Sequence, residues 1–163
     1  EFGAEDVAYS VAITNRYLGF GFLNGKVNLW ELDQIDKPKP ASSFQLDTPT
    51  SVTALAISPD QQQIAYGGQA GKIYLRDLNG QNSKQLAVGE GSALDIKFSP
   101  DGEELGVVLT SRQVRRWQAQ GNNDSLASLD GIYSFVNTLE HDEDKIIVVC
   151  SDTTNPIRAR SRR

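Results

Sequence analysis

The feature of this sequence that most constrains its fold is an internal repeat. The segment Ser58–Leu78 reads SPDQQQIAYGGQAGKIYLRDL and the segment Ser99–Trp117 reads SPDGEELGVVLTSRQVRRW, with the two Ser-Pro-Asp triplets 41 residues apart. The same shift places Leu55-Ala56-Ile57 on Ile96-Lys97-Phe98. Self-similarity at a period of about 40 residues indicates a repeat architecture, in which each unit is one supersecondary motif.

Two further copies flank this pair. On one side, NGKVNLWEL at Asn24–Leu32 resembles AGKIYLRDL at Ala70–Leu78. On the other side, Leu105–Leu109 aligns with Ile146–Cys150, although that copy is degenerate. The sequence therefore predicts four copies.

Each copy contains short apolar runs between turn residues, a pattern typical of β-strands. In the second copy these runs are VTALAIS, QIAYGG and KIYLRDL, and a fourth, weaker run such as SKQLAVG joins neighbouring copies. Four strands in about 40 residues is the length of a propeller blade. We expect an all-β fold, a β-propeller segment over 1–163 with about four four-stranded antiparallel blades, at approximately 7–47, 48–89, 90–130 and 131–160.

The charge balance argues against broad nucleic-acid binding. The chain has 16 basic and 21 acidic residues and a formal net charge of −5, the wrong sign for gripping a phosphate backbone. The exception is the arginine-rich end, formed by Arg158, Arg160, Arg162 and Arg163. Basic clusters are usually solvated, so we expect a solvated tail there, with an acidic surface or nucleic acid as the alternative partner.

A single cysteine, Cys150 in the apolar run IIVVC, excludes an intramolecular disulfide framework and fits a reducing compartment. No run reaches the roughly 18 to 20 apolar residues that cross a bilayer, and the first residues do not resemble a signal peptide. We expect a cytoplasmic protein that does not contact a membrane.

The motif search predicts no catalytic residue, no cofactor and no metal. The glycines of Gly67–Gly71 join two strands without the lysine or the following helix of a phosphate-binding loop, so they indicate a hairpin turn. His141–Asp144 reads HDED, and four adjacent residues on one turn lack the spaced ligands of a calcium loop. Cys150 and His141 lie at opposite ends of one predicted strand, too far apart for a catalytic dyad.

The chain resembles the WD-repeat family of β-propellers. The resemblance depends on the Ser-Pro-Asp turns, on Gly25-Lys26-Val27 and Gly71-Lys72-Ile73 before the third strands, and on the closing pairs Trp30-Glu31, Arg76-Asp77 and Trp117-Gln118. The family's Gly-His opening is absent, since the only histidine is His141. We therefore expect apolar packing between sheets to hold the blades together, with Trp30 and Trp117 in those interfaces.

The resemblance implies a non-catalytic scaffold for protein–protein interaction. Partners of such propellers usually bind the loops before the first strand and the hairpin between the second and third strands. Those loops here contain the candidate partner-binding residues Thr50, Gln69, Ser92, Arg112 and Asn155. The alternative function is a sensory or regulatory lobe of a larger signalling enzyme, an ATPase or a kinase.

Four blades would make about half of the seven-bladed ring that the family most often forms. The first and last blades of a half-ring expose more apolar area than a soluble monomer usually carries. Three arrangements would cover them: the remainder of the same polypeptide, a second copy in a two-fold dimer of eight blades, or closure of a four-bladed ring.

Overall fold

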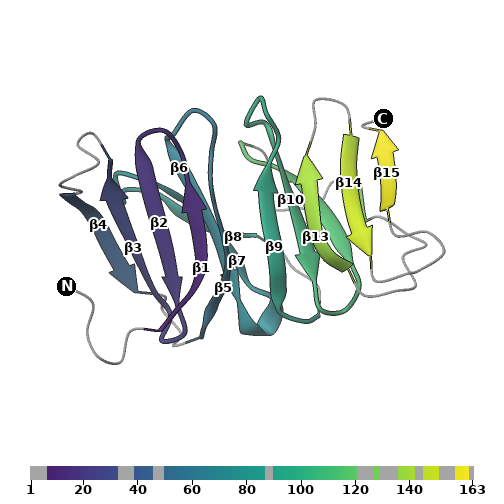
Figure 1. Cartoon of the computed structure of the whole chain (residues 1–163), viewed down its shortest axis with the longest axis horizontal. Coiled ribbons are helices and arrows are strands. Elements are labelled where there is room, and N and C mark those ends of the chain that lie inside the picture. Colours follow the sequence, from purple (N-terminus) through teal and green to yellow (C-terminus); the bar gives the residue numbers. More distant parts are fainter. Residues whose placement is uncertain are drawn as a thin grey trace.

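The strand patterns of the four copies become four antiparallel sheets in the computed structural model (Figure 1). The structure describes residues 7–32, 39–45, 50–86, 90–120, 127–128, 136–141, 145–150 and 157–161. Within them no helix has the length and hydropathy to span a bilayer. The predicted fold class, an all-β protein of propeller blades, is confirmed.

The first three sheets have four strands each. The first sheet contains β1 (Ala8–Ile13), β2 (Tyr17–Phe22), β3 (Lys26–Glu31) and β4 (Lys39–Gln45). The second contains β5 (Val52–Ile57), β6 (Gln63–Gly68), the 3-10 turn η1 (Gln69–Gly71), β7 (Ile73–Asp77) and β8 (Ser83–Leu86). The third contains β9 (Ala93–Phe98), β10 (Glu104–Leu109), β11 (Val114–Gln118) and β12 (Ala127–Ser128).

The fourth sheet has three strands among the described residues, β13 (Val136–His141), β14 (Lys145–Cys150) and β15 (Ile157–Ser161). Strands follow one another in chain order within every sheet. Neighbouring sheets meet through their first strands, because β1 contacts β5, β5 contacts β9 and β9 contacts β13. Figure 1 shows the result, four sheets side by side with the first and the last at opposite ends of the long axis.

A β-bulge recurs at the same place in each sheet. The pairing of the first with the second strand skips one residue at Tyr9, Thr53, Leu94 and Asn137. A bulge bends its strand and increases the local twist. Its repetition shows that the four sheets are copies of one structural unit, the degenerate fourth included.

The core consists of two apolar layers between sheets. One lies between the first and second sheets and includes Leu29, Leu55 and Tyr66; the other lies between the second and third sheets and includes Leu75 and Trp117. Trp117 is fully buried, so its predicted interface position is confirmed. Trp30, at the equivalent repeat position, is only half-buried.

Aromatic rings fill the layer between the first two sheets. The Tyr66 ring stacks on Tyr74 with centroids 5.5 Å apart and lies 5.2 Å from the Phe44 ring. The Arg76 guanidinium lies 4.6 Å from the Phe44 centroid. Burial raises the pKa of the Tyr66 phenol above its ordinary value, although contacts with Ser83 and Arg76 act in the opposite direction.

Glycines on β2 allow the second sheet to approach the first. An ideal Cβ on Gly21 would lie 2.4 Å from Val52 Cγ1, and one on Gly19 would lie 3.0 Å from Leu55 Cδ2. The distance at Gly21 excludes a Cβ unless Val52 moves, and the distance at Gly19 requires Leu55 to shift slightly. The aliphatic side chains of β5 therefore fill space that the glycines of β2 leave empty.

The close approach at Gly21 predicts that Gly21→Ala lowers the free energy of unfolding by about 1 to 3 kcal/mol, the usual cost of overpacking. Urea unfolding measures it. Because Val52 is the nearest neighbour across the joint, Gly21→Ala should cost less in a Val52→Ala background, and this coupling appears in a double-mutant cycle. Fully additive effects would contradict the contact.

Each Ser-Pro-Asp turn is held by a buried serine. The Ser99 hydroxyl donates to Asp101 and accepts from the Glu104 backbone N–H at 2.9 Å, while Asp101 accepts from the Glu103 N–H at 3.0 Å. In the second sheet, the Ser58 hydroxyl likewise donates to Asp60 and accepts from the Gln63 N–H, while Asp60 accepts from the Gln62 N–H. The repeated triplet is therefore a hydrogen-bonded hairpin turn, and Ser58 and Ser99 are both buried.

Ser99→Ala should lower the free energy of unfolding by about 1 to 3 kcal/mol, because the Glu104 N–H loses its side-chain acceptor in a buried place. Chemical denaturation measures the change. Ser111→Ala, at an exposed serine in another turn, is the control and should change stability by less than about 0.5 kcal/mol. Equal effects of the two changes would contradict the role of Ser99.

The arginine-rich end belongs in part to the fourth sheet. The register pairs Arg158 with Val148 and Arg160 with Ile146, and Val148 is buried. Ile157–Ser161 is the edge strand of the fourth sheet, paired with β14, which agrees with a predicted fourth blade that ends near residue 160. Solvation of the arginine side chains stays a prediction. Arg162 and Arg163 lie outside the described residues.

Candidate partner-binding edges

Four of the five candidate residues lie at one edge of the sheets. This start edge, defined by Thr50, Gln69, Ser92 and Arg112, is where the first strands begin and where the second strands turn into the third. It is the lower edge in Figure 1. The fifth candidate, Asn155, lies outside the described residues.

Thr50 lies between turns of the first and second sheets. An ideal Cβ on Gly25, in the β2–β3 turn, would lie 2.9 Å from the Thr50 carbonyl oxygen, and one on Gly68 would lie 3.7 Å from Thr50 Oγ1. The adjacent Ser51 hydroxyl donates to the Leu23 carbonyl at 3.0 Å. Thr50 is therefore held in place, whereas Gln69 is exposed on η1.

Ser92 is tied to the turn that carries Arg112. The Ser92 N–H donates to Thr110 Oγ1 at 2.8 Å, and the Thr110 N–H donates to the Ser92 carbonyl at 2.9 Å. One residue further on, the Thr53 hydroxyl donates to the Ala93 carbonyl at 2.6 Å, which joins the second sheet to the third. Loops of three consecutive sheets thus form one connected edge.

Arg112 has a left-handed backbone, with φ of 65°. Gly25 and Gly71 occupy the same position in the first two sheets, with φ of 82° and 65°. Gln61, at φ of 59°, likewise stands where the next Ser-Pro-Asp turn has Gly102 at 75°. Residues with a side chain are rare and strained in this region. Both positions therefore lower the free energy of unfolding relative to glycine, and the polar side chain is exposed in Arg112 and half-buried in Gln61.

Replacing either residue with glycine should therefore stabilise the fold. Arg112→Gly and Gln61→Gly are each expected to raise the free energy of unfolding by about 0.5 to 1 kcal/mol, because relief of the left-handed conformation, roughly 1 to 2 kcal/mol, exceeds the extra entropy that glycine loses. Thermal and urea unfolding measure the change. Gln69→Gly, in η1, is the control and should destabilise; a loss of stability in Arg112→Gly would contradict the strain.

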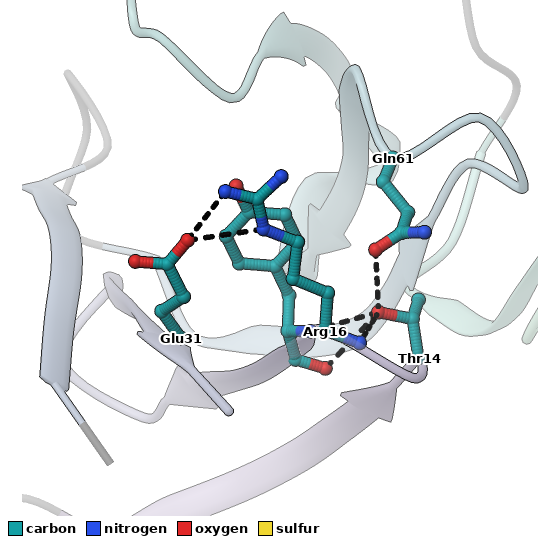
Figure 2. A network of polar contacts seen from close by, with 5 residues as sticks. Thr14, Arg16, Glu31 and Gln61 are labelled. Carbon is teal, nitrogen blue, oxygen red and sulfur yellow. Dashed lines mark hydrogen bonds and ion pairs between the residues drawn. The ribbon is translucent and has the colours of Figure 1, made fainter. Parts of the chain in front are cut away.

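The opposite edge, which carries the Ser-Pro-Asp turns, has its own polar network (Figure 2). The Arg16 guanidinium donates to Glu31 Oε1 at 2.6 and 3.0 Å. Thr14 Oγ1 lies 3.4 Å from Gln61 Oε1 and accepts from the Tyr17 N–H at 2.9 Å. The Thr14 to Gln61 contact joins the first sheet to the second.

Two neighbouring hollows open at this Ser-Pro-Asp edge. The larger has a volume of about 460 Å³ and the smaller about 410 Å³, and both are lined by Gln63, Asp77 and Gln120. Lys84 lines the larger hollow, where it donates to the Ala119 carbonyl at 2.8 Å and joins the second and third sheets. Burial lowers the pKa of the Lys84 ammonium.

Sequence reasoning did not select these hollows. The signal was present in the run Gln61-Gln62-Gln63, whose side chains line the smaller hollow. Gln120, which shares it, comes from the third sheet, and only the packing of the sheets brings it there. Across the described residues, no cluster of three His, Cys, Asp or Glu side chains has metal-binding geometry.

The fold and its two loop edges define a β-propeller segment, and comparisons with known proteins agree. The crystal structure of the computationally designed Ika4 protein superposes with a TM-score of 0.81 over 99% of this chain and 94% of that one, at 14% identity. That likeness supports the fold alone. No protein-family model matches the chain.

Two curated relatives share sequence with parts of the chain. Protein LST8 homolog from Drosophila melanogaster is 27% identical over 104 residues, which cover 63% of this chain and 32% of that protein. Actin-interacting protein 1-2 from Arabidopsis thaliana is 43% identical over 69 residues, which cover 40% of this chain and 11% of that protein. The chain thus spans a third or less of these relatives' length. Both are WD-repeat proteins, which supports the resemblance seen in the sequence.

Proposed function

We propose that this chain is a WD-repeat propeller segment that binds protein partners through the start edge and catalyses no reaction. The observation that carries the proposal is Arg112, which holds an exposed side chain on a left-handed backbone where two other sheets have glycine. Strain retained at a surface turn favours a role in recognition over a role in folding.

The composition of the edge supports the same function. Gln69 and Arg112 are long, polar and exposed, and Thr50 and Ser92 hold the loops beside them. Arginine is enriched among the residues that dominate binding energy at protein interfaces. Loops on a rigid sheet scaffold provide recognition without a convergent acid, base or metal.

The relatives favour this proposal over a regulatory lobe of a signalling enzyme. Both are WD-repeat proteins, and one is named for its interaction with actin. WD-repeat proteins generally act as interaction scaffolds. A cytoplasmic location is part of the proposal, and the single cysteine supports it.

The test uses the two glycine variants as a matched pair, because they relieve similar strain at opposite edges. Immobilised wild-type chain, Arg112→Gly and Gln61→Gly are compared for retention of defined probes and extract proteins. Actin filaments are the first defined probe, because one relative is named for binding actin. Arg112→Gly should weaken binding of the specific partner at least tenfold, in the range of an interface hot spot of about 2 kcal/mol, and Gln61→Gly should not.

The outcomes separate the two edges. Loss of the partner with Gln61→Gly but not with Arg112→Gly would move the binding site to the hollows of the Ser-Pro-Asp edge. Partner binding that neither variant changes would contradict a site at the start edge, and turnover of a substrate by the pure chain would contradict the non-catalytic part.

A further inference from the structure

The outer face of the first sheet is apolar and open. We define this outer face by Tyr9, Val11 and Ile13 on β1, Leu18 and Phe20 on β2, and Trp30 on β3. Their alternate neighbours point the other way, since the Ser10 hydroxyl donates to the Val52 carbonyl at 3.1 Å and Ala12 packs in the core. Tyr9, Val11 and Ile13 are 63%, 61% and 71% exposed. The strand register places Leu18 beside Ile13 and Phe20 beside Val11, both half-buried.

The equivalent positions in the next sheets are buried. Val11 corresponds to Leu55 and Ile96, which are 7% and 1% exposed. Phe20 corresponds to Tyr66 and Val107, which are 3% and 0% exposed. The same repeat position is therefore covered in two sheets and open in the first, so the openness comes from the lack of a neighbour and not from the chemistry of the position.

In the second and third sheets, the cover is the preceding sheet. Leu55 packs with Leu29 and Val27 of the first sheet in one cluster, and Trp117 packs with Leu75 and Ala65 of the second sheet in the other. Both joints bury apolar side chains of one sheet against the small and aliphatic residues of the sheet before it. What fits the outer face of the first sheet is another sheet of this kind.

The chain carries a second open sheet face at the other end of the arc. Ile147 and Val149 on β14 are half-buried, whereas Val148 between them is buried. The register pairs Ile147 with Ala159 and Val149 with Ile157. Figure 1 places this fourth sheet at the opposite end of the molecule from the first, so one chain cannot cover both faces by bringing them together.

We propose that the outer face of the first sheet binds the fourth sheet of a second copy of this chain, so that two copies related by a two-fold axis close a ring of eight sheets. Each copy then contributes both faces, and each face is covered once. A two-fold arrangement closes with no apolar face left over, and the joints continue the interface that already repeats between the sheets.

The area is sufficient for a stable dimer. At about 4.8 Å between strands and 3.3 Å per residue, four strands of six residues present a flat face of roughly 400 Å². The fourth sheet, with three described strands, presents roughly 300 Å². A copy that covers both faces therefore buries roughly 700 Å², close to the roughly 800 Å² that each partner buries in a standard protein interface. The sheet faces of this chain therefore match the requirement without help from the loops.

The decisive measurement is the molar mass of the chain by light scattering after size exclusion, over a hundredfold range of concentration. A mass of twice 17.9 kDa is expected. Val11→Asp and Ile147→Asp change one residue on each face. Each should raise the dissociation constant by roughly a hundredfold or more, because the two-fold axis repeats the change once in each joint and the dimer then buries two carboxylates. Val11→Thr, which is nearly the same size, replaces Val11→Asp if the latter does not fold.

Leu94→Asp is the matched control. Leu94 is a 42% exposed leucine at the bulge of β9, away from both faces, and its replacement should leave the dimer intact. A dimer that survives Ile147→Asp but not Val11→Asp would mean that two first sheets pair with each other, which overturns the proposal. A monodisperse monomer, or an open-ended series of larger species, overturns it as well.

Acrylamide quenching of tryptophan fluorescence gives an independent readout. The chain has two tryptophans, and Trp117 is fully buried in the monomer, so the quenchable fraction reports Trp30 on the outer face. This fraction should fall over the same concentrations at which the mass doubles. A quenchable fraction that stays constant while the mass doubles would place the dimer contact elsewhere. Arg112→Gly leaves the dimer unchanged, so failure here is distinct from failure of the proposed function.

Discussion

The structure depends on one contact that recurs between sheets, aliphatic side chains of one sheet entering the space that small residues leave on the sheet before it. Gly19 and Gly21 provide that space for Leu55 and Val52, and Gly67 provides it for the third sheet, where an ideal Cβ would lie 3.0 Å from Ala93 Cβ. Among the described residues, hydrogen bonds that join sheets lie near the edges, such as that from Thr53 to Ala93. The spacing and tilt of the sheets therefore follow from side-chain volume.

Apolar packing explains how the sheets hold together without the histidine network of the WD-repeat propellers that the sequence resembles. A buried polar network must be fully satisfied to contribute, and an apolar joint has no such requirement. The Ser-Pro-Asp turns provide the polar order instead, since each hairpin is fixed within one sheet by its own serine and aspartate. The sheets are thus held by packing, and the Ser-Pro-Asp hairpins by local hydrogen bonds.

The two positions that depart from the glycine pattern, Gln61 and Arg112, show how the edges have become different. One lies at the Ser-Pro-Asp edge and contacts Thr14 of the first sheet; the other lies at the start edge and is exposed. Both have a backbone that glycine would adopt at lower free energy. The same position of the repeat thus carries glycine in one sheet and a polar side chain in another.

The sequence alone specified the repeat, the strands and the turn chemistry, because alternation of apolar residues, glycines and Ser-Pro-Asp triplets acts within a few residues. It also determined which loops meet at the start edge, since strand order places Thr50, Gln69, Ser92 and Arg112 there. Tertiary structure alone decided that Trp30 is only half-buried whereas Trp117, at the same repeat position, is fully buried, and that Gln120 joins the glutamine-lined hollow. These outcomes depend on whether a neighbouring sheet is present, and residues distant in the chain supply that neighbour.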